Sequence, residues 1–85
     1  MECGQYYELW HSIHLYPEES VQAALDAKAE CIMPVHWGGF SLAMHSWKEP
    51  VERFLEAAHK TQLKVMTPVL GQVFSVESKY DTAWW

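Results

Sequence analysis

Two segments with helical periodicity, joined by a short apolar run, constrain the fold of this chain most. A proline and two glutamates at 17–19 predict a helix over about 17–28, because proline fits the first helical turn and acidic side chains favour the positive end of the helix dipole. An apolar stripe from Val51 to Ala58 predicts a second helix over about 46–60. This helix would begin at an S-x-x-E capping box, and its outer face carries two acid–base pairs four residues apart.

Short apolar runs follow both helical segments and predict strands. The runs over 30–35 and 63–69 are too brief for helices, and Pro34 and Pro68 mark their ends because proline cannot donate to a strand ladder. Polar and apolar residues alternate over 72–76, which predicts a third strand. The alternation of helix and strand favours an α/β fold with at least one parallel pair: two helices on one face of a short mixed sheet.

The length of 85 residues allows one small domain, residues 1–85, with a modest core. Yet 49% of the residues are hydrophobic, which argues against disorder and exceeds what so short a chain can cover. We therefore expect self-association into a dimer or larger assembly, or contact with a missing part of the fold. The terminal pair Trp84 and Trp85 is expected to dock on the rest of the chain.

Charge and cysteine content narrow the class of protein further. The net charge is −5 and the six basic residues are scattered along the chain. A nucleic-acid interface is basic and clustered, so we expect no nucleic-acid partner. No apolar run approaches the roughly 20 residues of a membrane span, and the first residues do not resemble a signal peptide. We therefore expect a cytoplasmic protein in which Cys3 and Cys31 are reduced thiols.

Histidine is the residue type that points most directly to chemistry, because it binds metals and transfers protons near neutral pH. His36 follows a predicted strand and opens a glycine loop, so it is either a functional ligand or a capped structural histidine. His11 and His14 are three residues apart, but the sequence around them does not favour a helix that would align them. His59 lies beside the apolar stripe of the second helix and is expected to be structural, and His45 completes the set of five.

Three segments resemble one known family. The runs 13–24 (IHLYPEESVQAA), 33–43 (MPVHWGGFSLA) and 47–50 (WKEP) are similar to the C-terminal part of metallo-β-lactamase-fold hydrolases. The resemblance is to the branch of N-acyl-phosphatidylethanolamine-hydrolysing phospholipase D and the ascorbate-6-phosphate lactonase-like proteins. It extends over about residues 2–76.

This resemblance implies a partial αββα sandwich and a site for one or two metal ions, usually zinc. His36 matches the last metal ligand of the family, and His14 matches a histidine near the active site, where we expect a catalytic role. His45 falls in a loop that is expected to face the same cleft. The His-x-His-x-Asp-His motif and most of the fold are absent from the chain, so we expect the chain alone to be inactive.

Three functions remain open on the sequence. The first is the C-terminal part of a zinc-dependent hydrolase of phosphodiester, lactone or related small-molecule esters, present here as a fragment or a truncated reading frame. The second is a non-catalytic module that self-associates or binds a partner. The third is a small metal-binding protein whose ligands would be His11, His14, His36 and His45.

Overall fold

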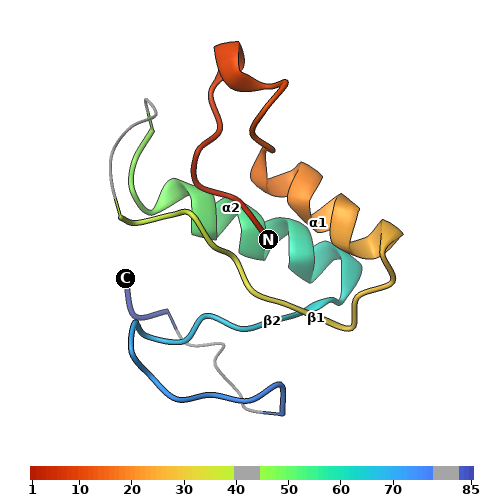
Figure 1. The fold of residues 1–85 in the computed structure, drawn as a ribbon. Coiled ribbons are helices and arrows are strands. Elements are labelled where there is room, and N and C mark those ends of the chain that lie inside the picture. The colour runs from red at the N-terminus through yellow and green to blue at the C-terminus, as the bar shows by residue number, and fades with distance from the viewer. Residues whose placement is uncertain (40–44, 78–82) are drawn as a thin grey trace.

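The computed structural model describes residues 1–39, 45–77 and 83–85, and these form a mixed α/β unit. Figure 1 shows both helices on the same side of a small two-stranded sheet. Among the described residues, no helix is both long and apolar enough to cross a membrane. In chain order the elements are η1 (Glu8–Trp10), α1 (Pro17–Asp26), β1 (Cys31–Ile32), α2 (Glu49–Thr61) and β2 (Lys64–Val65).

The sheet is parallel, and its two strands are much shorter than the predicted ones. Ile32 pairs with Val65, and the backbone N–H of Met66 donates to the carbonyl of Ile32 at 2.9 Å. Beyond this pair the ladder soon ends, as expected where Pro34 and Pro68 offer no N–H to a neighbour. The prediction of at least one parallel pair is confirmed, as is the coarse α/β class.

Two predictions about the sheet are wrong. The segment 72–76 does not form a strand: its polar–apolar alternation is present, but no neighbouring strand pairs with it in the described part of the chain. In its place, the N-terminal segment joins the sheet through a parallel bridge between Glu2 and Val35. Every strand contact in the described ranges is therefore parallel, and the sheet is not mixed.

Both predicted helices form, but their ends differ from the predicted ones. Helix α1 stops at Asp26 because the chain turns at Lys28, where φ is 59°. Helix α2 begins at Glu49 and not at Ser46: the Ser46 hydroxyl accepts a 3.4 Å bond from the N–H of Lys48, outside the helix, and caps no later residue there. The capping box predicted over 46–49 is therefore wrong, although the helix that it was expected to begin is present.

The core lies where the two helices meet the sheet. Phe54 and Val51 of α2 are fully buried, and Val21 of α1 and Ile32 of β1 are nearly so. Cys3 joins this cluster from the N-terminal segment, which links the segment to the helices as well as to the sheet. The core therefore contains residues from both sides of the loop that follows β1: Ile32 before the loop and Phe54 after it.

The terminal tryptophans dock, as predicted. The indole N–H of Trp84 donates to the carbonyl of Thr67 at 2.9 Å. The rings of Trp84 and Trp85 lie 5.6 and 5.5 Å from the ring of Trp37, measured between centroids. These contacts bring the end of the chain against the residue that follows His36.

Candidate functional site

His36 stands in an unusual backbone conformation at the end of the β1 segment. Its φ is +61°, in the left-handed region that only a few per cent of non-glycine residues adopt, with asparagine, aspartate and histidine the most frequent among them. The backbone on its N-terminal side is held by two hydrogen bonds: Val35 N–H donates to Met1 O at 2.7 Å, and Cys3 N–H donates to Val35 O at 3.1 Å. The exposed His36 side chain is therefore presented by a backbone that the N-terminal segment fixes.

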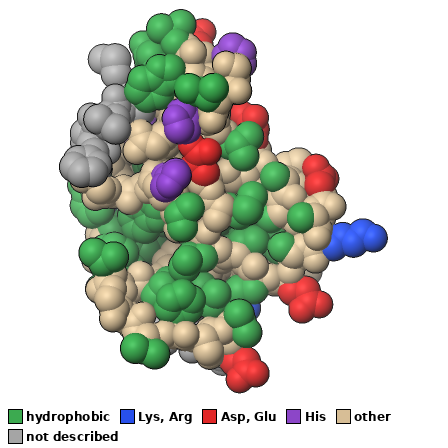
Figure 2. Space-filling view, viewed as in Figure 1, with side chains coloured by type: hydrophobic (Ala, Val, Ile, Leu, Met, Phe, Trp, Pro, Cys, Tyr) green, Lys and Arg blue, Asp and Glu red, His purple; other side chains and the backbone are tan. Residues whose placement is uncertain are grey.

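A groove brings His36 together with His14. It has a volume of about 470 Å³, and its walls are mostly apolar, formed in part by Trp10, Ile13 and Trp37. Figure 2 shows histidine side chains near one another on this face, with acidic side chains beside them and hydrophobic surface around them. The two histidines singled out from the sequence thus line one groove, although 22 positions separate them in the chain (36 − 14).

His14 has a partner that the sequence did not reveal. Its Nδ1 contacts the carboxylate of Glu2, and both side chains are partly buried. Its ring also lies 6.1 Å from the ring of Trp10, between centroids. Glu2 and His14 are twelve residues apart, so no local spacing could have indicated the pair.

The other three histidines do not line this groove. His45 stacks on Tyr6 with ring centroids 4.1 Å apart, and its Nδ1 lies 3.1 Å from the carbonyl of Ser46. The Nδ1 of His11 lies 3.0 Å from the carbonyl of Glu8, and its side chain is otherwise exposed. His59 is exposed on α2. A four-histidine site built from His11, His14, His36 and His45 is therefore not assembled.

The described residues do not make a zinc centre by themselves. Within 1–39, 45–77 and 83–85, no group of three or more histidine, cysteine, aspartate or glutamate side chains is placed to hold a metal ion. A catalytic zinc needs three protein ligands and an open position. His36 and His14 offer imidazole nitrogens to the groove, but a complete set of ligands would need further residues.

The Cys3 thiol does not add a nucleophile to the site. Cys3 is fully buried, and this burial raises the pKa of its thiol to about 12. Because the thiolate is the reactive form, Cys3 is inert at neutral pH. Cys3 and Cys31 are both free, in agreement with the prediction from the sequence.

A second hollow borders His36 on the side of the terminal tryptophans. It has a volume of about 410 Å³, and Val35, Trp47, Leu70 and Trp84 are among its apolar walls. Leu70 is 98% exposed, and Trp47 is 45% exposed. An apolar surface of this kind typically contacts another part of a protein or a partner.

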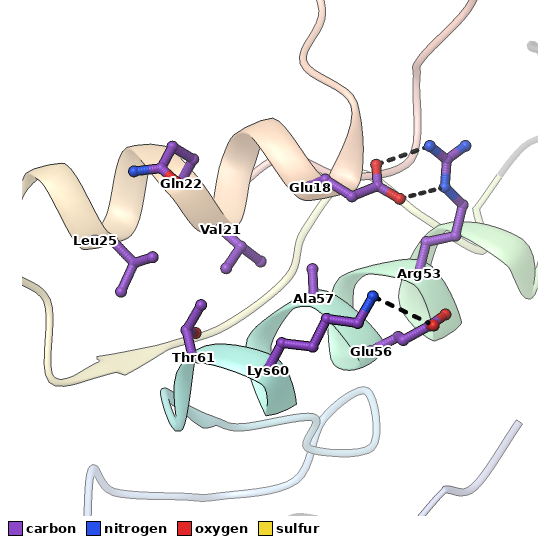
Figure 3. A pocket seen from close by; sticks show the side chains of 9 residues that line it. All are labelled: Glu18, Val21, Gln22, Leu25, Arg53, Glu56, Ala57, Lys60 and Thr61. Carbon is purple, nitrogen blue, oxygen red and sulfur yellow. Dashed lines mark hydrogen bonds and ion pairs between the residues drawn. The ribbon is translucent and has the colours of Figure 1, made fainter.

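A third hollow, of about 360 Å³, lies between the helices and is crossed by ion pairs (Figure 3). Arg53 of α2 donates two hydrogen bonds of 2.7 Å to the carboxylate of Glu18 on α1. The guanidinium also lies 4.7 Å from the ring centroid of Tyr6. The helical pairs Glu49–Arg53 and Glu56–Lys60 form as predicted, at 3.4 and 3.7 Å, but the pair between the helices has the better geometry. Ion pairs account for the charged groups of this hollow.

Replacing Glu18 with glutamine is expected to lower the free energy of unfolding by about 0.5–1 kcal/mol at neutral pH, since the pair is partly exposed. Burial alone would raise the pKa of the Glu18 carboxyl, but hydrogen bonds from Arg53 outweigh it and hold the pKa below its usual value. Because the pKa is lower in the folded state, the stabilisation exists above the unfolded pKa and is lost as pH falls through the folded one.

Urea unfolding of wild type and Glu18→Gln at neutral and acid pH measures this effect. The difference should be present at neutral pH and close to zero in acid. Glu56→Gln is the matched control, because its 3.7 Å contact with Lys60 lies within one helix and is highly exposed. An equal loss in both variants would contradict the special weight given to the pair between the helices.

Comparison with known proteins finds relatives much longer than this chain. An uncharacterized protein of Mycobacterium tuberculosis is 47% identical over 75 residues, which are 85% of this chain and 20% of that protein. The N-acyl-phosphatidylethanolamine-hydrolyzing phospholipase D, mitochondrial, of Saccharomyces cerevisiae is 36% identical over 55 residues, 62% of this chain and 12% of that protein. The outer membrane protein RomA of Klebsiella pneumoniae is 47% identical over 38 residues, 45% of this chain and 29% of that protein.

The chain therefore spans about a fifth of the length of the mycobacterial relative. No family model matches it, and no solved structure matches it. The similarity to the yeast phospholipase D agrees with the branch that the motifs suggested from the sequence.

Proposed function

We propose that this chain corresponds to the C-terminal part of a zinc-dependent hydrolase with a metallo-β-lactamase-like αββα sandwich. The proposed substrates are small molecules with phosphodiester, lactone or related ester bonds. The observation that carries the proposal is the groove that His14 and His36 both line. It occurs in a chain whose sequence is similar to that of a protein named as a phospholipase D.

In this proposal His36 is one metal ligand, and the remaining ligands come from the part of the protein that precedes this segment. When bound, zinc supplies a water of lowered pKa and polarises the ester. His36 suits a ligand position because its side chain is exposed in the groove on a fixed backbone. His14, on the same groove, would contact the substrate or the reacting atoms. The 85 residues alone are proposed to be inactive.

The exposed apolar surface beside His36 supports the proposal that this chain is one part of a larger fold. Val35, Trp47 and Leu70 expose large apolar side chains beside His36. Such surface is usually covered by another part of the protein or by a partner. We propose that the remainder of a longer protein covers this surface; the self-association expected from the composition would bury the same surface.

The proposed location is the cytoplasm, whereas the name of the yeast relative places that protein in mitochondria.

The proposal is tested in a chimera. The segment of the Mycobacterium tuberculosis relative that matches this chain is replaced by the sequence of this chain, and bound zinc and hydrolysis of a generic phosphodiester are measured. We expect the chimera to bind zinc and to hydrolyse the ester. His36→Ala should lose bound zinc and lower the rate by more than roughly 100-fold, since even the groups that orient metal ligands are worth 10–100-fold.

The matched control is His59→Ala, an exposed histidine on α2 that does not line the groove. It should leave zinc content and rate unchanged. A chimera that binds no zinc, or a His36→Ala variant that retains full zinc content and rate, would overturn the proposal. The 85-residue chain assayed alone should show no hydrolysis, and activity there would contradict the proposed division of the site.

A further inference from the structure

The pair formed by Glu2 and His14 has the geometry of an oriented imidazole. The Glu2 carboxylate contacts Nδ1 of His14, and the two side chains are only 22% and 31% exposed. A carboxylate is an acceptor only, so the ring nitrogen that it contacts must carry the proton. Nε2 is then the nitrogen left to interact with other groups.

Glu2 itself is held from two directions. Its backbone forms the parallel bridge with Val35, directly before His36. Its carbonyl accepts a hydrogen bond from the hydroxyl of Ser20, a fully buried residue in α1. The backbone of Glu2 is therefore attached to the Val35 segment and to α1, and its side chain reaches His14 from a fixed position.

We propose that Glu2 is a positioning residue: it holds His14 as the Nδ1-protonated tautomer, with Nε2 presented to a polar group of a ligand in the groove shared with His36. His14 belongs to the less regular chain between η1 and α1, so no helix or strand orients its ring, and the Glu2 carboxylate is the group that contacts Nδ1. Unprotonated Nε2 would accept a hydrogen bond from such a ligand, and the protonated imidazolium would donate one.

This inference deepens the proposed function, since it assigns an orienting partner to the histidine placed beside the ester. It depends on the hydrolase only for the identity of the ligand. The orientation itself is a property of the 85-residue chain, so it can be tested without metal, substrate or activity. Failure of the hydrolase proposal and failure of this inference are therefore distinguishable.

The test is a two-bond proton–nitrogen NMR spectrum of the nitrogen-15-labelled chain, recorded in mildly alkaline solution where imidazoles are neutral. In wild type, Nδ1 of His14 should have the frequency of a protonated ring nitrogen and Nε2 that of an unprotonated one. In Glu2→Ala the two should exchange, because a free imidazole favours the Nε2-protonated form. His14→Gln identifies the signals by their disappearance.

Two further variants decide the cause. Glu2→Gln keeps an acceptor oxygen and should retain the wild-type tautomer, which a purely electrostatic role for Glu2 would not allow. Glu30→Ala removes an exposed glutamate that does not line the groove and should change nothing. Wild-type His14 mainly in the Nε2-protonated form overturns the inference, whether or not Glu2→Ala folds; so does an unchanged tautomer in a folded Glu2→Ala.

Discussion

Phe54→Ala is expected to lower the free energy of unfolding by about 3–5 kcal/mol, the loss typical of a large buried aromatic replaced by alanine. The Phe54 side chain is fully buried on α2, in the cluster that also holds Val21 of α1 and Ile32 of β1. Its removal opens a cavity where both helices meet the sheet. A domain of this size has a total stability on the order of 5–10 kcal/mol, so the variant should be close to unfolding.

Urea unfolding followed by far-ultraviolet circular dichroism measures this loss. Phe74→Ala is the matched control: it is the same substitution at a side chain that is 40% exposed, and it should cost much less. Similar losses in the two variants would mean that the cluster around Phe54 is not the core of the folded chain.

The helices of this fold could be predicted from the sequence because their causes are local. A proline and acidic residues at the start of α1, and an apolar stripe along α2, act within a few turns. The strands were harder, since a strand depends on its neighbour. The segment 72–76 has the alternation of a strand, but no strand forms there in the described residues, whereas irregular Glu2 forms a bridge with Val35.

The candidate site divides in the same way. His36 was located from its position after a strand and before two glycines, and His14 from the family resemblance. Their meeting in one groove depends on how the η1 segment folds back, which no spacing in the sequence encodes. Neither the contact of Glu2 with His14 nor that of Glu18 with Arg53 could be found from helical spacing, because twelve and 35 residues separate the partners.

The predicted role of His45 illustrates the limit of resemblance. It was expected to face the cleft, but in the structure it stacks on Tyr6 and does not line the groove. Its immediate neighbours 40–44 lie outside the described residues. His14 and His36 line the groove, and their roles as catalytic residue and metal ligand stay predictions.

Gly4→Ala is expected to destabilise the chain by about 3 kcal/mol and to displace His36, because a side chain at position 4 has no space. A Cβ atom there would lie 1.8 Å from the carbonyl oxygen of His36 and 2.5 Å from the Cα of Trp37. Both are backbone atoms, which cannot rotate away as the end of a side chain can. Overpacking of this kind typically costs 1–3 kcal/mol or more, and here the strain falls on a backbone that is already at positive φ.

Two measurements separate the effect on stability from the effect on the site. Urea unfolding gives the loss of free energy, and NMR signals of the His36 imidazole report its surroundings. Gly39→Ala is the matched control in the same loop: no described atom lies within 4 Å of its Cβ position, so stability and the His36 signals should change little. If Gly4→Ala retained wild-type stability and wild-type His36 signals, the close approach of the N-terminal segment would not be what holds His36. The expected result makes glycine a geometric requirement at position 4: a glycine lets the N-terminal segment pass close enough to His36 to fix the backbone that presents the proposed ligand.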